Sequence, residues 1–390
     1  MRLNIEFSER LKKLPLYLFV EIDKAKQEAK SQGRDVIDLG VGDPDLPTPD
    51  FIIQALNKAV ASGDNHHYAF DAGLPRLRQL IANWYKQRFN VELNPDTEIY
   101  PLIGSKEGIA HLPLGIINPK DKVLIPQPSY PPYVSGTIFA DGKITVLPLK
   151  AKNNFLPDLK KISELKGKGV KLMFLNYPNN PTSAIVAKEF LAEVIRIARE
   201  NEFIVAYDNA YSEIYFDIEK PPSILELEGA KEVAIEFHSL SKTFNMTGWR
   251  IGWVCGNSKV VSVLAKIKSN IDSGIFQAVQ LAGIAALESD GSFPEEMRRV
   301  YHERRDYLVN GLRNIGWKID PPQATFYVWA KLPKKFKSSI EAANVFLEKA
   351  DIVVTPGVGF GKEGEGYLRM ALTVPKERLS QAVERLKKIL

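Results

Sequence analysis

Residues 239–250 read Ser-Leu-Ser-Lys-Thr-Phe-Asn-Met-Thr-Gly-Trp-Arg and lie between two apolar runs. The first run is Val233-Ala-Ile-Glu-Phe-His238, and the second is Ile251-Gly-Trp-Val-Cys255. Both runs have the length and the β-branched and aromatic content of strands. Lys242 is therefore expected on a short connection between two strands, where a rigid scaffold often presents functional side chains. We call residues 239–250 the lysine segment.

The neighbours of Lys242 suit a phosphate group. Ser239 and Ser241 supply hydroxyl groups, and Arg250 supplies a guanidinium that can bind phosphate oxygens in pairs. A lysine amine can form a Schiff base with a carbonyl group. Together these residues suggest a phosphorylated aldehyde, as found in pyridoxal phosphate. The alternative for this segment alone is a polar surface loop with a solvated lysine.

Upstream of the lysine segment, strand-like and helix-like stretches alternate. The strand candidates are 99–103, 122–125, 143–148, 171–175 and 203–207, and the helix candidates are 50–61, 73–89, 106–117, 130–139, 157–165 and 186–201. This alternation predicts an α/β fold with a mostly parallel central sheet and helices on both faces. Apolar runs such as Leu172-Met-Phe-Leu175 are typical of strands that are buried on both sides.

The two ends of the chain have a different pattern. Residues 8–32 have the apolar spacing of one helix, and 36–40 read as a strand. Further helices are expected at 294–314, 338–349 and 376–390, with strands at 324–330, 352–354 and 367–372. The ends thus predict a smaller α+β domain. We expect an N-terminal arm and part of this domain at 1–45, a large domain at 46–285, and the rest of the small domain at 286–390.

Bulk composition narrows the function classes. The chain has 390 residues, of which 45% are hydrophobic and 25% charged, as in a soluble globular protein with a large core. The net charge of +5 is spread along the chain, which argues against a nucleic-acid-binding protein. No apolar run is long enough for a membrane span, no signal peptide is apparent, and Cys255 is the only cysteine, so we expect a cytoplasmic protein. The histidines form no HExxH motif, so no metal site is predicted.

Three further segments place polar residues where strand-like runs end. They are Ile103-Gly-Ser-Lys-Glu-Gly108, Asn176-Tyr-Pro-Asn-Asn-Pro-Thr182 and Ala206-Tyr-Asp-Asn-Ala-Tyr-Ser212. The first opens a helix, where backbone N–H groups can bind an anion. The other two follow strands, at the edge where open α/β sheets bind ligands. Taken singly, each segment is also explained as an ordinary polar turn or a helix cap.

In their order and spacing, these segments resemble the class I and II aminotransferases, which are fold-type I enzymes that use pyridoxal phosphate. The resemblance covers nearly the full chain and implies a large domain of the pyridoxal-phosphate-dependent transferase type. It implies that Lys242 holds the cofactor as a Schiff base and acts as general base and acid. It also implies that Asp208 pairs with the pyridinium nitrogen, while Asn180 and Tyr211 hydrogen-bond the phenolic oxygen.

The same resemblance implies roles for the remaining site residues. Tyr130 would stack on the cofactor ring, and the phosphate ligands would be Ser105, Lys106, Ser239, Ser241 and Arg250. Tyr68 would reach the phosphate of a neighbouring subunit, which implies a homodimer with shared active sites. Arg369 would bind the substrate α-carboxylate together with the backbone of Gly42. The sequence departs from the usual pattern at Ser183, where glycine is common, at Asn209, where an acidic residue is common, and at Tyr130, where some relatives have tryptophan.

Several strings are closest to one branch of the family, the LL-diaminopimelate aminotransferases. The most telling are Ser105-Lys-Glu-Gly108 and Glu236-Phe-His-Ser-Leu-Ser-Lys242. That branch converts tetrahydrodipicolinate and glutamate to LL-diaminopimelate and 2-oxoglutarate in lysine biosynthesis. It implies that Tyr17 lines the substrate entrance and that Asn270 approaches the site across the dimer. Core packing for Tyr17 and a helix-end position for Asn270 are the alternatives.

Other functions on the same scaffold remain open at this point. One is a broad aspartate, alanine or aromatic aminotransferase, since pocket shape rather than motifs decides the substrate. Another is a carbon–sulfur lyase that uses the same cofactor. A regulatory module that binds pyridoxal phosphate is disfavoured, because the enzyme-like pattern begins within the first forty residues and leaves no room for a DNA-binding domain.

Overall fold

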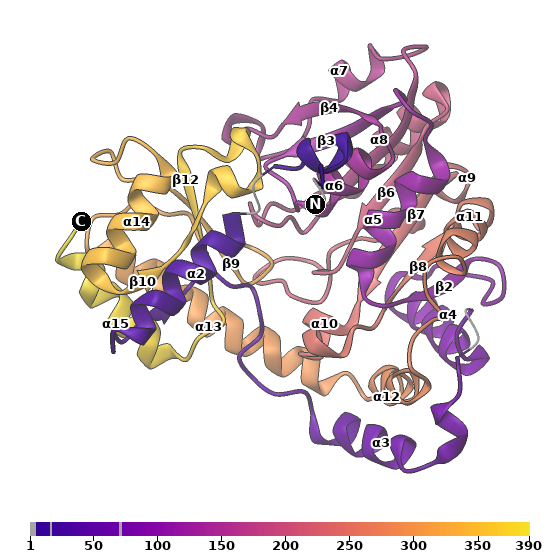
Figure 1. Ribbon diagram of the computed structural model, residues 1–390, viewed down its shortest axis with the longest axis horizontal. Helices are drawn as coiled ribbons and strands as arrows, with labels where there is room; N and C mark the ends of the chain where they lie inside the picture. Colours follow the sequence, from indigo (N-terminus) through magenta and orange to yellow (C-terminus); the bar gives the residue numbers. More distant parts are fainter. Residues whose placement is uncertain (1–4, 16–17, 70–71) are drawn as a thin grey trace.

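The computed structural model describes residues 5–15, 18–69 and 72–390 of the chain. Figure 1 shows a large part built on one wide sheet and a smaller part that carries the C-terminus. Strand β1, from the N-terminal region, pairs with β10 in the smaller part, so the two ends of the chain meet there. This confirms the predicted α/β fold with a mostly parallel sheet and a smaller sheet-containing domain.

The wide sheet has seven strands in the order β2-β8-β7-β6-β5-β3-β4. Their bounds are β2 (Ile99–Leu102), β3 (Lys122–Gln127), β4 (Lys143–Pro148), β5 (Val170–Asn176), β6 (Ile204–Asp208), β7 (Ala234–Ser239) and β8 (Gly252–Gly256). Neighbours are parallel from β4 to β7, whereas β8 is antiparallel to both β7 and β2. The lysine segment joins β7 to β8, so it turns the chain back at the carboxyl end of β7.

Helices cover both faces of this sheet. Leu172 and Phe174 pack into one apolar layer with the first group of helices, and Met173 and Leu175 pack into the opposite layer with the second group. The first group is α5 (Ser105–Ile116), α6 (Pro132–Phe139) and α11 (Ser258–Lys268); the second is α4 (Pro75–Phe89), α8 (Lys188–Asn201) and α12 (Gln277–Leu287). Burial on both faces explains why the strands read as continuous apolar runs.

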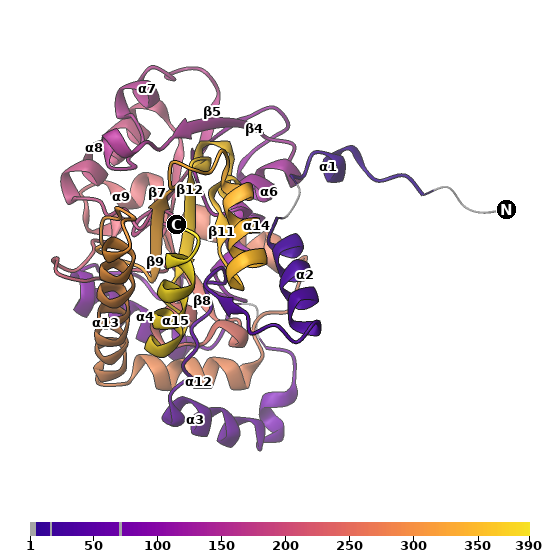
Figure 2. The same cartoon turned by 90° about the vertical axis from the view of Figure 1, so that its left-hand side faces the viewer.

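The smaller part contains two short sheets. In the first, β1 (Ile37–Asp38) pairs in parallel with β10 (Ile352–Val353), and in the second, β12 (Tyr367–Ala371) lies between β11 (Thr355–Pro356) and β9 (Tyr327–Lys331). Its helices are α2 (Leu18–Ser31), α13 (Ser292–Asn314), α14 (Ser339–Ala350) and α15 (Lys376–Lys387). Figure 2 shows α13 and α15 side by side, in contact with each other. We propose domain boundaries near residues 45 and 285, where the chain passes between the two parts.

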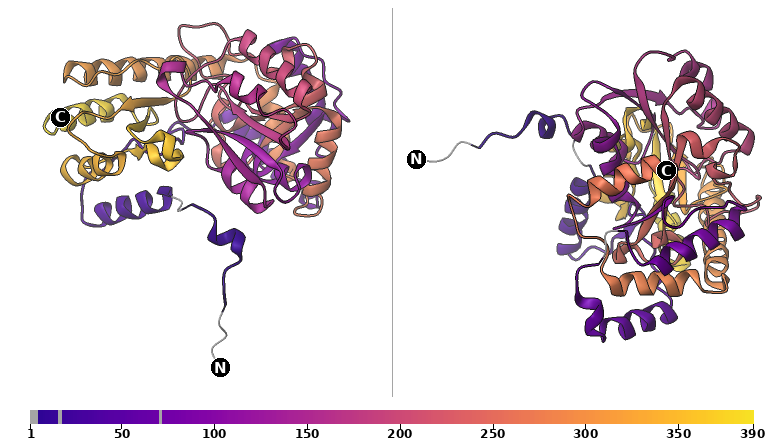
Figure 3. Two further views of the ribbon diagram at one scale, coloured as in Figure 1. Left: turned by 90° about the horizontal axis from the view of Figure 1, so that it is seen from above. Right: turned by 90° about the vertical axis from the view of Figure 1, so that its right-hand side faces the viewer.

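The N-terminal region differs from its prediction. The sequence predicted one helix over 8–32, but α1 (Glu9–Lys12) ends before residues 13–15, which are not helical, and α2 begins at Leu18. Pro15 lies in the break, and proline lacks the backbone N–H that a continuous helix needs. Figure 3 shows the segment with α1 extending away from the body of the molecule.

The remaining elements are short helices and the peripheral helix α3. They are α3 (Asp50–Val60), α7 (Leu159–Ser163), α9 (Ala230–Val233), α10 (Leu240–Thr243) and the 3-10 helices η1 (Gly63–His66), η2 (Ala151–Asn153), η3 (Ile224–Glu226), η4 (Thr247–Trp249), η5 (Gly357–Phe360) and η6 (Lys362–Gly364). Within the described ranges, no helix has the length and apolar character to cross a membrane. The same ranges contain no group of three or more histidine, cysteine or acidic residues arranged to hold a metal ion.

A buried ion cluster joins α5 to the end of α11. The side chain of Lys268 is fully buried, and its Nζ lies 3.1 Å from Glu107 Oε2 and 2.6 Å from Asp272 Oδ1. Glu107 also accepts a hydrogen bond from the backbone N–H of Ile103 at 2.8 Å. The cluster therefore ties the first turn of α5 to the segment that follows α11.

Replacing Lys268 with alanine is expected to lower the free energy of unfolding by about 2–3 kcal/mol, because it removes a buried cation from between two partly buried carboxylates. The change is measured from the shift of the urea unfolding midpoint. Lys266→Ala is the matched control, since Lys266 is exposed on the same helix and its removal should cost less than about 0.5 kcal/mol. Equal midpoints for the two variants would contradict this prediction.

Candidate functional site

One cavity lies where the carboxyl ends of β5, β6 and β7 meet the smaller domain. The predicted residues that line it are Gly42, Ser105, Lys106, Tyr130, Asn180, Asp208, Tyr211, Ser239, Ser241, Lys242, Arg250 and Arg369. These residues come from both ends of the chain and from its middle. The structure thus brings together most of the residues singled out in the sequence, at the sheet edge where ligands of open α/β folds bind.

Lys242 lies in α10, one turn beyond the end of β7. Its Nζ donates a hydrogen bond to the backbone oxygen of Gly42 at 3.0 Å. Burial lowers the pKa of Lys242 to about 8; Asp43 acts in the opposite direction, and Arg369 and Arg250 lower it further. About a tenth of this amine is therefore neutral at pH 7, far more than for an ordinary lysine, and the neutral form is the one that can act as a nucleophile or a base.

Asp208 is the last residue of β6, and its side chain is buried. Its Oδ2 accepts a hydrogen bond from the hydroxyl of Tyr133 at 2.8 Å, whereas Oδ1 has no hydrogen-bond partner among the described residues. Burial raises the pKa of Asp208 to about 6, although the bond from Tyr133 lowers it. A buried carboxylate oxygen without a partner is costly, so this atom is suited to a cationic N–H donor of a ligand.

An anion cradle is formed where α5 begins beside the lysine segment. Ser105 opens α5, so the backbone N–H groups of its first turn face the cavity end of the sheet. Gly104 has a φ of 73°, and a Cβ there would lie 2.4 Å from the guanidinium of Arg250. A glycine is therefore needed for Arg250 to approach the helix terminus. A phosphate requires several hydrogen-bond donors, and three kinds are present here: the N-terminus of α5, the serine hydroxyl groups and the guanidinium of Arg250.

Arg369 provides a second cationic group, in the part of the cavity wall that the smaller domain forms. It projects from β12 and is 3% exposed. Its guanidinium donates to Asn180 Oδ1 at 2.9 Å and to the backbone oxygen of Gly40 at 2.7 Å. The rings of Tyr327 and Phe360 lie 4.1 and 4.7 Å from it. A guanidinium held in one orientation by these contacts is suited to bind a carboxylate through two hydrogen bonds.

Two tyrosines connect the wide sheet to β9 at this site. The hydroxyl groups of Tyr211 and Tyr327 are 2.9 Å apart, and burial raises the pKa of Tyr211. A Cβ at position 42 would lie 1.9 Å from the hydroxyl oxygen of Tyr327. Position 42 therefore requires glycine, which also brings its backbone oxygen within reach of Lys242.

Two predicted residues do not line the cavity in this single chain. Tyr68 is 91% exposed. Asn270 is exposed just beyond α11, and its side chain donates to the backbone oxygen of Lys266 at 2.8 Å. Tyr17 lies outside the described residues. The roles of these residues stay predictions.

The cavity also contains residues that sequence reasoning missed. They are Pro131, Asn176, Ala210, Thr247, Tyr327 and Phe360. Asn176 ends β5 and donates to the backbone oxygen of Asp208 at 2.7 Å, which its position in the quoted polar turn had signalled. Tyr133, which holds Asp208, is the second residue of α6 and lies three positions after Tyr130, and that proximity was its available signal. Tyr327 carries no comparable signal, because it lies inside an apolar strand.

Comparison with known proteins agrees with this geometry. Residues 34–386 match the family model described as aminotransferase class I and II. The chain is 54% identical to an LL-diaminopimelate aminotransferase of Aquifex aeolicus (strain VF5), over 98% of this chain and 99% of that protein. It is 51% identical to one of Desulforudis audaxviator (strain MP104C), over 97% of each chain.

Solved structures give the same result. A substrate-bound BacF structure from Bacillus subtillis superimposes with a TM-score of 0.95 at 38% identity, covering 99% of this chain and 98% of that one. An aspartate aminotransferase mutant from Thermus thermophilus gives a TM-score of 0.93 at 29% identity, with all of both chains covered.

Proposed function

Because this chain belongs to the class I and II aminotransferases, which depend on pyridoxal phosphate, we propose that it interconverts LL-diaminopimelate and 2-oxoglutarate with tetrahydrodipicolinate and glutamate, in lysine biosynthesis. The observation that carries the proposal is the identity of 50–54% to relatives named LL-diaminopimelate aminotransferase, over nearly the whole of both chains. The aminotransferase reaction itself follows from the family, whereas the choice of substrate is the proposal.

The residues of the cavity fit pyridoxal phosphate. Asp208 Oδ1, buried and without a partner among the described residues, suits the N–H of a pyridinium ring. The helix terminus at Ser105 and the guanidinium of Arg250 suit the phosphate, and the amine of Lys242 suits the aldehyde. When bound, the cofactor supplies an electron sink for the pair of electrons left on the substrate Cα.

The protein side chains would then bind, orient and move a proton. Arg369 would hold the substrate α-carboxylate, and the rings of Tyr327 and Phe360 would keep water from its guanidinium. With its lowered pKa, Lys242 would accept the Cα proton at Nζ as a neutral amine and, as an ammonium, would deliver it to the former aldehyde carbon of the cofactor. Asn180 and Tyr211 would donate to the phenolic oxygen of the cofactor, and Tyr130 would cover its ring.

The proposed enzyme is a homodimer with shared active sites, located in the cytoplasm. Tyr68 is 91% exposed, Ile271 53% and Phe276 45%, and in this proposal the second copy covers them. In this proposal, Tyr68 and Asn270 reach the site of the neighbouring subunit and Tyr17 lines the substrate entrance. A monomer in light scattering of the active enzyme would contradict it. The single, buried cysteine suits a reducing compartment.

An amino-donor screen tests the substrate. The purified enzyme is loaded with pyridoxal phosphate and supplied with 2-oxoglutarate, and glutamate formation is measured with LL-diaminopimelate, aspartate, alanine and an aromatic amino acid. We expect kcat/KM for LL-diaminopimelate to exceed the others by at least about a hundredfold. A preference for aspartate, alanine or the aromatic donor would contradict the proposal. Pyruvate formed from cystathionine without an oxo acid would instead indicate a lyase.

The pKa of Lys242 predicts the pH dependence of cofactor attachment. Only the neutral amine attacks the aldehyde, so the rate of attachment should rise with pH and level off above about pH 8. An ordinary lysine, with a pKa of 10.5, would keep gaining rate up to about that pH. The rate is measured by mixing cofactor-free protein with pyridoxal phosphate, stopping with borohydride, and quantifying the modified peptide by mass spectrometry. Exposed lysines in the same samples are the internal control. A Lys242 profile parallel to theirs would contradict the prediction.

A further inference from the structure

The turn that follows β6 presents different residues to the cavity and to the rear of the sheet. Asp208 and Tyr211 line the cavity. Asn209 and Ser212 instead make contacts with residues of β7 behind it. The last backbone bond between the two strands here runs from the N–H of Asn209 to the oxygen of Phe237, at 2.9 Å. Beyond it, side chains rather than the strand ladder connect this turn to β7.

The centre of the rear contacts is the fully buried carboxylate of Glu236, in β7. Its Oε1 accepts from the hydroxyl of Tyr85 at 2.9 Å and from the side-chain amide of Asn209 at 3.1 Å. Its Oε2 accepts from the hydroxyl of Ser223 at 2.6 Å and from the backbone N–H of Ile224 at 3.1 Å. Four donors match the acceptor capacity of one carboxylate. Burial raises the pKa of Glu236 to about 7, and the side-chain donors act against this shift.

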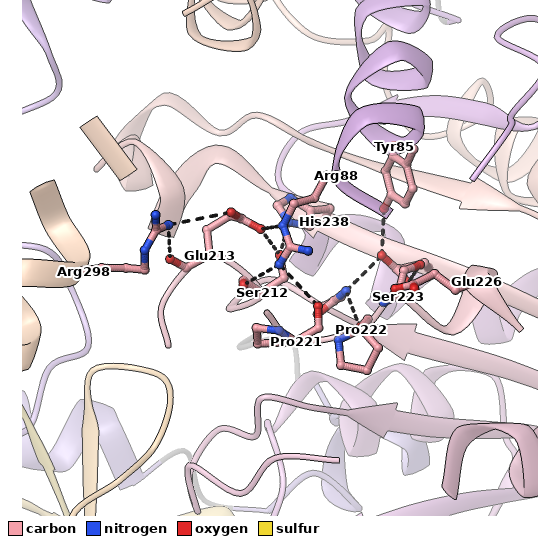
Figure 4. A network of polar contacts seen from close by, with 12 residues as sticks. Tyr85, Arg88, Ser212, Glu213, Pro221, Pro222, Ser223, Glu226, His238 and Arg298 are labelled. Carbon is pink, nitrogen blue, oxygen red and sulfur yellow. Dashed lines mark hydrogen bonds and ion pairs between the residues drawn. The ribbon is translucent and has the colours of Figure 1, made fainter. Parts of the chain in front are cut away.

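A second set of contacts holds the same turn further along. The hydroxyl of Ser212 lies 2.9 Å from Nε2 of His238, and Arg88 pairs with Glu213 at 2.9 Å. Figure 4 shows this network running from Arg298 through Glu213 and Arg88 to the group around Tyr85. His238 is stacked on Trp253, and burial lowers its pKa to about 3, so it is a neutral packing residue.

The pairing of Asn209 with Glu236 is directional. The amide nitrogen of Asn209 donates to Glu236, and its other nearby acceptor is the backbone oxygen of Pro222 at 3.4 Å. Its Oδ1 is buried with no partner among the described residues. The amide thus gives up one hydrogen bond so that its nitrogen can face the carboxylate. An aspartate at 209, with the same shape, would place two carboxylates against each other.

We propose that Glu236 is a positioning residue for the cofactor site, which acts through Asn209 to fix the turn at 208–211 and so aims Asp208 and Tyr211 into the cavity. This inference rests on the proposed cofactor-binding roles of those two residues. It goes beyond them by assigning a function to a charged residue that touches neither cofactor nor substrate. The four donors around Glu236 matter here, because both of its oxygens act as acceptors and therefore fix which atom of Asn209 faces it.

The test exchanges donor and acceptor between the two positions. Asn209→Asp places two carboxylates against each other, and Glu236→Gln puts an amide nitrogen against either Asn209 or the donor Ile224. The double variant Asn209→Asp/Glu236→Gln restores one donor opposite one acceptor. Each single change is expected to weaken pyridoxal phosphate binding by about tenfold, to alter the visible circular dichroism of the bound cofactor, and to lower kcat more than it changes KM. The double variant should recover most of the affinity and the spectrum.

Controls separate positioning from folding. Glu98→Gln also removes a hydrogen-bonded carboxylate, which accepts from the N–H of Asn94 at 2.8 Å, but it precedes β2 at the end of the sheet away from the cavity. Glu98→Gln should leave cofactor affinity unchanged.

Thermal unfolding of the cofactor-free protein shows whether the single variants fold. If they fold poorly, Tyr85→Phe is used instead, because it removes one donor to Glu236 and keeps the ring. It should weaken cofactor binding by about threefold.

The outcomes are distinct. Wild-type affinity, spectrum and kcat in both single variants would overturn the inference, and so would a double variant no better than the worse single one. Failure of the wild-type protein to bind pyridoxal phosphate would instead overturn the proposed function, and it is measured first for that reason.

Discussion

Lys242→Ala is expected to reduce turnover by at least about a thousandfold with the proposed substrates, because the variant loses the group that moves the Cα proton. The amine of Lys242 is placed for this by its bond to Gly42 and by a pKa lowered to about 8. The measurement is the steady-state kcat at saturating pyridoxal phosphate, together with the rate of a single half-reaction with LL-diaminopimelate.

The same variant should still bind the cofactor. Asp208, Ser105 and Arg250 remain, so pyridoxal phosphate is expected to bind without the covalent bond, and borohydride should no longer attach it to the protein. Lys266→Ala is the matched control, since it removes an exposed lysine of α11 and should leave kcat unchanged. If Lys242→Ala kept a tenth or more of the wild-type kcat, the assignment of Lys242 as the base would be wrong.

Asp208→Asn is expected to lower kcat by about a hundredfold or more, because an amide of the same shape cannot stabilise a protonated pyridine nitrogen as a carboxylate does. Asparagine can still accept the hydrogen bond that Tyr133 donates to Oδ2, so the fold around β6 should be preserved. The checks are kcat at saturating cofactor and the dissociation constant of pyridoxal phosphate, which should rise.

Tyr133→Phe provides a graded comparison for Asp208. It removes the hydrogen bond that lowers the pKa of Asp208 but leaves the carboxylate in place. Its loss in cofactor affinity should be about tenfold and smaller than that of Asp208→Asn. A larger effect from Tyr133→Phe than from Asp208→Asn would contradict the role given to the carboxylate.

The sequence predicted the parts of the site that lie at strand ends. Asp208 and Lys242 follow apolar runs, and Ser105 opens a helix directly after one, so their positions relative to the sheet could be inferred from local pattern alone. The parallel sheet brings such ends to one edge, which is why these residues meet in the cavity. The continuous helix predicted over 8–32 was wrong because apolar spacing was given more weight than Pro15.

Residues whose partners come from distant elements could not be predicted in this way. Glu236 appears in the sequence only as one charge within an apolar strand. Its donors Tyr85, Asn209 and Ser223 come from α4, from the turn after β6 and from the segment before η3. The role of Tyr327 could not be predicted either, because the clash between its hydroxyl group and a Cβ at position 42 becomes visible only when the position of β9 is known. The positions of Tyr68 and Asn270 relative to a second subunit stay predictions.

The pairing of β1 with β10 determines when the cavity can form during synthesis of the chain. Ile37 emerges from the ribosome long before its partner Ile352, because most of the wide sheet and its helices lie between them in the sequence. Until then, the segment that supplies Gly42 to Lys242 has no strand to pair with, and Arg369 does not yet exist. A nascent chain that ends before β10 therefore contains all seven strands of the wide sheet, which can form domain by domain, but it lacks one wall of the cavity. Substrate binding through Arg369 can begin only after β12 has been synthesised.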